Sequence, residues 1–390
     1  MSSTAYQPFP VTELKTALYN YTKPWIRPQD AFEPLENAFV YRGILQKRGG
    51  SYQLGPALPD GTPVMGIMQY INPSDGSQQL VVATQQFLYA LNVGANPSLD
   101  TYVKITSVSN SPVWSGTVTG TLTVPYFWTS ALVGTVTVEI KDANGTGIAT
   151  TTSDVSDNFP ANGVISGGSV NRATGTLTLN ITGSTPNCTI YVSCSLNPST
   201  PYFTGDITNF FNFTNWQPTS SSTFTSSTSY LYMTNNKDPV TLYDGSSLAR
   251  PGFYVSSNHS SYITKALDVK VYDNRLLLIV PALSTSTTPD NQGIFWSALF
   301  NPFNFFNDIA GNGGALSAAT SNILKTALFL RDDLIVGFKN GSTWSFQRTG
   351  IASSPFIFRK LNDSKSIDCP YGGEEYDQRV TNVGDTGLIA

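Results

Sequence analysis

The sequence is short of charge and of reactive side chains. Only 12% of its 390 residues are charged, and the net charge is −4, whereas a globular protein carries about 25% charged residues. It holds a single histidine and three cysteines. A chain this neutral lacks the basic surface that binding to duplex DNA requires. No apolar run of about 18 residues predicts a membrane-spanning helix, and the start MSSTAYQPFPVTELK has no feature of a secretory signal.

Uncharged polar and aromatic residues take the place of the missing charge. There are 42 Ser, 45 Thr and 29 Asn, together with 32 Gly, 19 Tyr and 22 Phe. Thr, Tyr and Phe suit half-buried strands, while Ser, Asn and Gly suit turns. The composition therefore predicts an all-β protein, with one short helix expected around residues 11–19. Its 12% aromatic and 40% hydrophobic content excludes a disordered chain.

A change in amino-acid composition within the sequence predicts an inserted domain. Between Pro112 and Asn197 there are six charged residues, and Thr alternates with apolar residues in runs such as GTVTGTLTVPYF. This pattern is typical of an immunoglobulin-like β-sandwich. On both sides, strand–turn–strand units recur at intervals of about 60 residues, as in radial β-repeats. We therefore expect a β-propeller, with an N-terminal strand segment and first blades at 1–109, the inserted sandwich at 110–198 and the remaining blades at 199–390.

The residues that could carry chemistry do not form a recognisable catalytic motif. The sequence contains no G-x-S-x-G motif that would supply a nucleophilic serine for His259, which lies in SSNHSS. We therefore predict that His259 is a solvated loop residue. Cys188 and Cys194 lie on one face of a predicted strand, where they alternate with polar residues, and are too far apart for a disulfide. We predict that both are small core residues. Cys369 stands alone, and no zinc-ligand spacing is present.

Two further patterns have simpler explanations than a metal or an active site. Asp142, Asn144 and Thr146 begin like a calcium loop, but Ser153 occupies the position of the required Glu, so a hairpin turn is the better interpretation. An acidic cluster could supply two carboxylates for glycoside hydrolysis, and it comprises Asp363, Asp368, Glu374, Glu375 and Asp377. We predict no catalytic residue, no metal, no cofactor and no enzyme activity.

Aromatic residues gather in two runs, YFTGDITNFFNFTNW and FWSALFNPFNFF. Such runs can act as sugar-stacking platforms, but core and interface packing is the commoner use of so many phenylalanines.

Three pieces of the sequence together resemble a known family. AFEPLENAFVYRGILQKRGG is similar to the N-terminal strand of tail nozzle (hub, head-to-tail stabilisation) proteins of short-tailed bacteriophages. LYMTNNKDPVTLYDG, DVKVYDNRLLLIVPA and LFLRDDLIVGFKNGSTWSFQ resemble successive blades of their propeller. The segment from SGTVTGTLTVPYF to IYVSCSL resembles small sandwich modules of phage virion proteins, with Arg172 where an aromatic residue is commoner. The sequence ends at GDTGLIA, within an expected blade, so the propeller is expected to be incomplete as given.

The resemblance implies a structural role in the virion tail after assembly in the host cytoplasm. Such proteins form a six-fold ring below the portal and adaptor, extend the DNA channel and hold the genome until ejection. A nearly neutral surface would let DNA pass without specific binding. We expect the protein to contact other copies of itself and other tail proteins, and not a membrane. The expected contact surface is a basic strand and two aromatic clusters. These residues are Arg42, Lys47, Arg48, Phe210, Phe211, Phe303, Phe305 and Phe306.

An alternative function is binding of a host-receptor carbohydrate by a tail-associated protein that uses the inserted sandwich. Specific glycan binding by residues 110–198 would favour this alternative.

Overall fold

The protein is built from β-strands throughout the part of the chain that can be described. The computed structural model describes residues 38–41, 44–47, 56–92, 101–125, 128, 131–218, 228–286, 288–306, 313–339, 341–363, 367, 370–371, 373–376, 379–384 and 387–389. Every regular element in these ranges is a β-strand, which confirms the all-β prediction. Within these ranges there is no helix that could span a membrane. The helix expected at 11–19 lies outside the described residues.

The chain divides into two compact units, Met1–Leu54 and Gly55–Ala390. In the first unit, β1 (Ala38–Tyr41) and β2 (Ile44–Lys47) form an antiparallel hairpin. All other described strands belong to the second unit.

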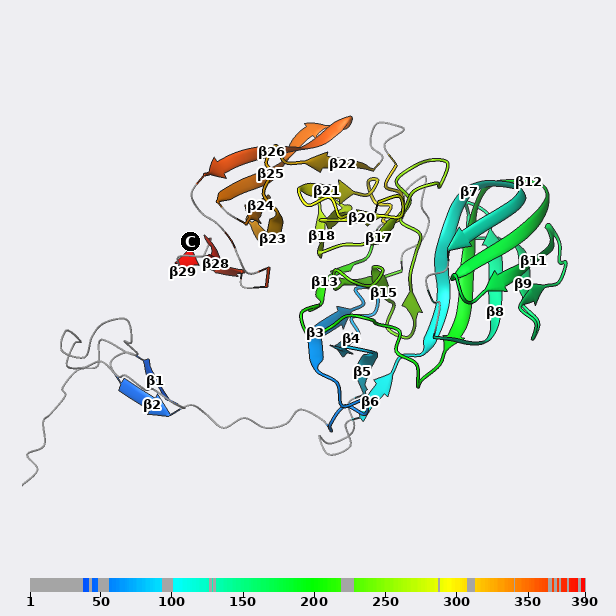
Figure 1. Ribbon diagram of the computed structural model, residues 1–390, viewed down its shortest axis with the longest axis horizontal. Helices are drawn as coiled ribbons and strands as arrows, with labels where there is room; N and C mark the ends of the chain where they lie inside the picture. The colour runs from blue at the N-terminus through cyan, green and yellow to red at the C-terminus, as the bar shows by residue number, and fades with distance from the viewer. Residues whose placement is uncertain are drawn as a thin grey trace, which may run out of the picture. The chain divides into compact units, whose positions relative to one another are not determined.

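Four successive groups of four antiparallel strands form the blades of a β-propeller in the second unit (Figure 1). Blade 1 contains β3 (Val64–Ile71), β4 (Gln78–Thr84), β5 (Leu88–Asn92) and β6 (Thr101–Lys104), and blade 2 contains β13 (Asn212–Trp216), β14 (Tyr230–Thr234), β15 (Thr241–Tyr243) and β16 (Leu248–Ala249). Blade 3 contains β18 (Asp268–Tyr272), β19 (Arg275–Ile279), β21 (Gly293–Trp296) and β22 (Gly314–Ser317), and blade 4 contains β23 (Leu324–Leu330), β24 (Asp333–Phe338), β25 (Ser342–Ile351) and β26 (Ser354–Asn362). Three of them are separate sheets, and the strands of blade 2 are one end of a ten-stranded sheet, because β16 also pairs in parallel with β7 (Ser107–Pro125), at Leu248 and Val108. Each blade is a meander in chain order, which is the repeat that defines a propeller.

Tyrosine side chains join neighbouring blades. The Tyr70 hydroxyl in blade 1 donates to the Asp244 carbonyl beyond β15, at 2.7 Å, and the Tyr70 ring meets the Tyr243 ring edge-on at 5.4 Å. The Tyr272 hydroxyl in blade 3 donates to the Asp332 carbonyl of blade 4, at 2.6 Å. Because each ring fills the apolar space between two sheets while its hydroxyl reaches a partner at the rim, tyrosine suits this position.

Smaller strand groups complete the second unit. β17 (Ile263–Lys265) pairs with β20 (Ala282–Leu283) beside blade 3. β27 (Glu374–Tyr376), β28 (Arg379–Gly384) and β29 (Gly387–Ile389) form a three-stranded meander after blade 4.

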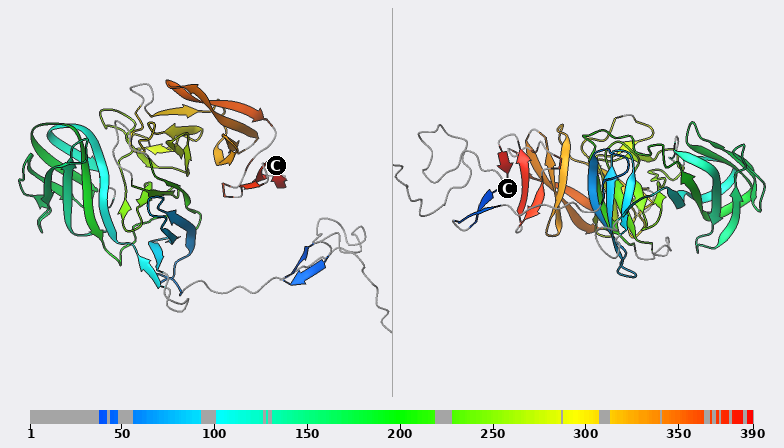
Figure 2. Two further views of the ribbon diagram at one scale, coloured as in Figure 1. Left: turned by 180° about the vertical axis from the view of Figure 1, so that it is seen from behind. Right: turned by 90° about the horizontal axis from the view of Figure 1, so that it is seen from below.

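Six strands lie between blades 1 and 2, in the segment predicted as an insertion, and we refer to them as the insert (Figure 2). They are β7 (Ser107–Pro125), β8 (Leu132–Lys141), β9 (Gly147–Thr152), β10 (Asn158–Phe159), β11 (Ile165–Asn171) and β12 (Thr176–Leu196). The long strands β7 and β12 pair along their lengths, with β-bulges that allow them to bend. The first half of β12 also pairs with β11 and its second half with β8. The immunoglobulin-like assignment of this insert stays a prediction.

The alternation of apolar and polar residues along β12 explains its two faces. Leu177, Leu179 and Ile181 are buried in the first half, and Ile190 and Val192 in the second. Cys188 and Cys194 are buried on the same strand as free thiols without a disulfide, which confirms them as small core residues.

Removing a buried ring from a blade should destabilise the propeller strongly. Phe346 in β25 is fully buried and stacks on Phe356 at 4.7 Å. We expect Phe346→Ala to lower the free energy of unfolding by about 3–5 kcal/mol, because it removes apolar contacts and leaves a cavity. Phe213→Ala is the matched control, since this ring is 38% exposed. Urea unfolding followed by fluorescence measures both; equal losses would contradict the assignment of Phe346 to the blade core.

Candidate functional site

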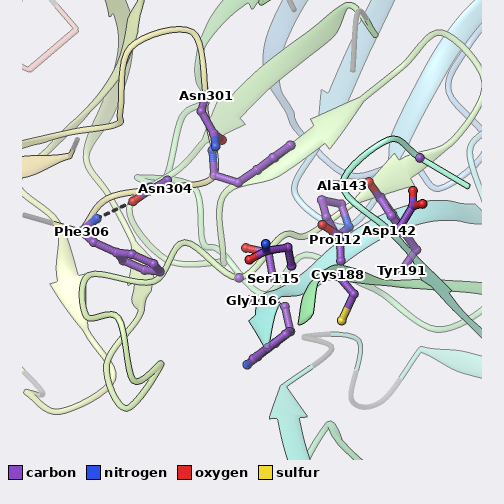
Figure 3. Close-up of a pocket in the computed structure, with 16 residues that line it drawn as sticks. Pro112, Ser115, Gly116, Asp142, Ala143, Cys188, Tyr191, Asn301, Asn304 and Phe306 are labelled. Atoms are coloured by element: carbon purple, nitrogen blue, oxygen red, sulfur yellow. Dashed lines mark hydrogen bonds between the residues drawn. The ribbon is translucent and has the colours of Figure 1, made fainter. Parts of the chain in front are cut away.

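A cavity of about 430 Å³ lies where the insert meets a loop of blade 3. We call it the junction pocket. The insert contributes residues of β7, the β8–β9 turn and β12, and the other wall is the loop 301–306 after β21. Figure 3 shows Asn301, Asn304 and Phe306 on one side and Pro112, Asp142 and Cys188 on the other. The pocket therefore unites segments that are about 100 to 190 residues apart in the sequence, so no local motif could reveal it.

The segment that follows β16 fixes the insert against the blades. The backbone N–H of Gly252 donates to the Pro112 carbonyl at 3.2 Å, and the Tyr254 hydroxyl donates to the Val113 carbonyl at 2.9 Å. A Cβ on Gly252 would lie 2.7 Å from that Val113 oxygen, so only glycine allows the two backbones to approach this closely.

Arg250, at the start of the same segment, is a buried cation. It is 4% exposed, and its guanidinium carbon lies 4.0 Å from the centroid of the Trp128 ring. Nη2 donates to the Tyr202 carbonyl at 2.8 Å and Nε to the Thr241 hydroxyl at 3.1 Å. Burial lowers the pKa of Arg250 to about 10, partly offset by the Asp238 carboxylate, so the side chain stays charged at neutral pH.

His259 lies among aromatic rings beside the junction pocket, and the prediction that it is a solvated loop residue was wrong. Its ring stacks on Trp114 at 4.8 Å and meets Tyr254 and Phe306 edge-on at 4.5 and 5.3 Å. The backbone of His259 has a φ of 56°. Its Nε2 is buried without a hydrogen-bond partner in the described part of the chain. Burial lowers the pKa of His259, so the ring is neutral at pH 7.

The polar side chains of the pocket are held by their own turns. Asp142 Oδ1 accepts the backbone N–H groups of Asn144 and Thr146 at 2.9 and 2.8 Å, which confirms the predicted hairpin turn. Asn301 Oδ1 accepts from the Phe303 N–H at 3.1 Å, and Asn304 Oδ1 accepts from the Phe306 N–H at 2.9 Å. No group of three or more His, Cys, Asp or Glu side chains able to hold a metal ion occurs within the described ranges.

The thiol that lines the pocket is not a nucleophile. Cys188 is 1% exposed, and burial raises its pKa to about 11. Because the thiolate is the reactive form, a thiol with this pKa stays protonated and inert at neutral pH.

The predicted contact residues fall in different environments. Phe211 and Phe305 are 8% and 2% exposed, so these two rings belong to the core of this chain and offer no surface to a partner. Phe210 is 43% exposed and meets the Tyr371 ring at 5.4 Å. Phe303 and Phe306 are half-buried in the junction pocket. Lys47 ends β2, whereas Arg42 and Arg48 lie outside the described residues.

The structure does not bring the described members of the acidic cluster together as a pair. Glu374 and Glu375 are exposed neighbours on β27, so their side chains point to opposite faces. Asp363 forms an ion pair with Lys360. Asp368 and Asp377 lie outside the described residues.

Sequence reasoning missed the insert's contribution to the pocket. Trp114 and Tyr191 line it, yet in the sequence both occur within alternating strand patterns that predict only a core. The run FWSALFNPFNFF was the available signal, because it supplies two rings and two asparagines of the opposite wall.

Comparisons with known proteins identify no family. No protein-family model and no curated protein matches the chain. Among solved structures, the chain is similar to the crystal structure of BamB from Moraxella catarrhalis, with 12% identity over 91% of this chain and 93% of that one and a TM-score of 0.28. It is also similar to BBS1N in complex with ARL6DN, with 10% identity over 84% and 90% of the two chains and a TM-score of 0.25.

Replacing Arg250 should destabilise the link between insert and blades. We expect Arg250→Leu to lower the free energy of unfolding by about 3–5 kcal/mol, because it leaves buried hydrogen-bond partners and a nearby carboxylate without their cation. Arg359 of β26 is exposed and provides the control. We expect Arg359→Leu to change the free energy of unfolding by no more than about 0.5 kcal/mol. Chemical denaturation measures both. A loss below 1 kcal/mol for Arg250→Leu, on the order of a surface substitution, would refute this role.

His259 should make stability depend on pH near neutrality. Its pKa in the folded chain lies below the unfolded value of about 6.5, so the unfolded chain binds the proton more readily and stability falls as the pH drops through about 6.5. It is the sole histidine of the sequence. Asn tolerates the positive φ at this position, so in His259→Asn the slope of unfolding free energy between about pH 7.5 and 5.5 should flatten. An unchanged slope would show that another group titrates.

Proposed function

We propose that the protein is a non-enzymatic structural component of a bacteriophage virion, a tail nozzle or hub protein that assembles with copies of itself into a ring. The observation that supports this most is the order of the parts. A hairpin segment, a first blade, six inserted strands and three further blades follow one another along the chain. This is the order in which the family-like motifs occur in the sequence.

In this proposal the ring extends the DNA channel below the portal and adaptor, retains the genome and then releases it. The distribution of charge supports a surface that DNA passes without specific binding, since several cations are neutralised within the chain. Lys141 pairs with Glu139, Arg172 with Asp157, Lys270 with Asp268, Arg348 with Asp273 and Lys360 with Asp363. A paired cation has little free charge left to displace counterions from a phosphate.

Exposed apolar side chains on blade 4 support contacts between subunits. Ile351, Ile357 and Leu361 are 58%, 42% and 56% exposed on the β25–β26 hairpin. Apolar side chains grouped on a surface mark sites of protein association. The basic N-terminal strand and Phe210 remain our proposed contacts to neighbouring copies and tail proteins.

Charge reversal in the N-terminal segment tests ring formation. We expect the triple variant Arg42→Glu, Lys47→Glu and Arg48→Glu to stay monomeric where the natural chain forms a ring, because like charges across a contact repel. Sedimentation velocity and electron microscopy of purified protein measure this.

The control reverses three exposed basic residues of the blades, Lys237→Glu, Lys339→Glu and Arg359→Glu, with the same change of net charge. The control should still assemble. A ring formed equally by both triple variants would overturn the N-terminal contact, and a natural chain that stays monomeric at all concentrations would count against the ring itself.

A further inference from the structure

We propose that the junction pocket binds a neutral saccharide. The inference stands apart from the nozzle proposal, because it rests on the lining of one cavity and not on assembly. Three properties of that lining carry it: aromatic walls, fixed neutral donors, and a single charged group that is negative.

Aromatic rings from both parts of the chain form the walls. Tyr191 comes from the insert, and Phe303 and Phe306 from the loop of blade 3. Trp114 of the insert also lines the cavity, but it is 7% exposed and its ring stacks on His259. The two phenylalanines are half-buried, so part of each ring faces the cavity. A sugar ring has one face of C–H groups that packs on aromatic surface, and a cavity of about 430 Å³ falls within the usual range of small-molecule sites.

The polar groups of the pocket are preorganised to meet hydroxyls. The Oδ1 atoms of Asn301 and Asn304 are occupied by N–H groups of their own loop, which orients both amides and leaves their NH₂ groups as donors. The Oδ1 of Asp142 is likewise held by its turn, and its Oδ2 has no hydrogen-bond partner in the described ranges. Hydroxyls both donate and accept, so they can satisfy amide donors and a carboxylate oxygen together.

The charge of the lining selects against other ligands. Asp142 is the one charged side chain that lines the pocket within the described residues. Its carboxylate repels phosphates, uronic acids and sialic acids. The neighbouring Lys141 is engaged by Glu139 at 3.0 Å and lies 5.0 Å from the Tyr191 ring centroid. A wholly apolar ligand would bury the amide NH₂ groups without partners, which costs free energy.

The insert alone cannot build this site. Residues 110–198 provide one wall, and Asn301, Asn304 and both phenylalanines provide the other. Bound saccharide would therefore bridge insert and propeller, and we expect binding by the whole chain.

Ligand-observed saturation-transfer NMR on the full chain tests the proposal. The neutral probes are lactose, maltose and N,N′-diacetylchitobiose, and 3′-sialyllactose is the anionic match of lactose. We expect at least one neutral probe to bind with a Kd of about a millimolar, and sialyllactose to bind at least about tenfold more weakly than lactose if lactose binds. Absence of transfer to all three neutral probes, or tighter binding of sialyllactose, would overturn the proposal.

Two substitutions locate the binding. Asn304→Asp keeps the acceptor for the Phe306 N–H but removes the amide donor and adds a negative charge, and Phe306→Leu removes a ring. Each should weaken binding at least about tenfold. The matched control is Asn72→Asp, because Asn72 Oδ1 accepts the Ser74 N–H in the same kind of turn in blade 1, away from the pocket lining.

Thermal unfolding of each variant separates lost binding from lost folding, and Phe306→Leu decides the test if Asn304→Asp does not fold. Undiminished affinity in a folded Phe306→Leu or Asn304→Asp variant would place the saccharide elsewhere. An equal loss in Asn72→Asp would do the same.

Discussion

A buried guanidinium joins the insert to the propeller, and the geometry of the candidate site depends on it. Arg250 leaves the outer strand of blade 2 and packs its charge against Trp128. Burying a cation costs free energy unless its hydrogen bonds are satisfied. The guanidinium of Arg250 donates to the Tyr202 carbonyl, which precedes blade 2, and to the Thr241 hydroxyl in β15 of that blade. These requirements fix the start of the next segment, so Gly252 and Tyr254 are brought onto β7.

The contact of Gly252 and Tyr254 with β7 holds one wall of the junction pocket in place. The loop of blade 3 is tied to the same segment, because the Phe305 N–H donates to the Tyr254 carbonyl at 3.3 Å. Tyr254 therefore contacts β7 through its hydroxyl and the blade-3 loop through its backbone. A site assembled from distant segments needs such common anchors, since positions on independent loops would vary too much to bind a small molecule.

The sequence permits prediction of the strands but not of their meeting points. Alternation along β12 predicts its buried face, and turn residues at Asp142 predict the hairpin, because both signals are local. The run FWSALFNPFNFF shows the limit. Phe305 is buried and Phe306 borders the pocket, but a loop has no period that would distinguish them. His259 was misjudged for the same reason: its polar neighbours predict solvent, while its ring partners come from β7 and from blade 3.

The shortage of charge gains a structural meaning from these contacts. Many side-chain oxygens of Asn and Asp bond to backbone N–H groups of their own turns, as at Asn72, Asp244 and Asn301. A surface whose polar groups are satisfied in this way attracts few partners without specificity. Polar groups left unpaired then stand out against that background. The NH₂ groups of Asn301 and Asn304 have no hydrogen-bond partner among the described residues, although the Oδ1 atoms do, and they lie where half-buried rings could hold a ligand in front of them.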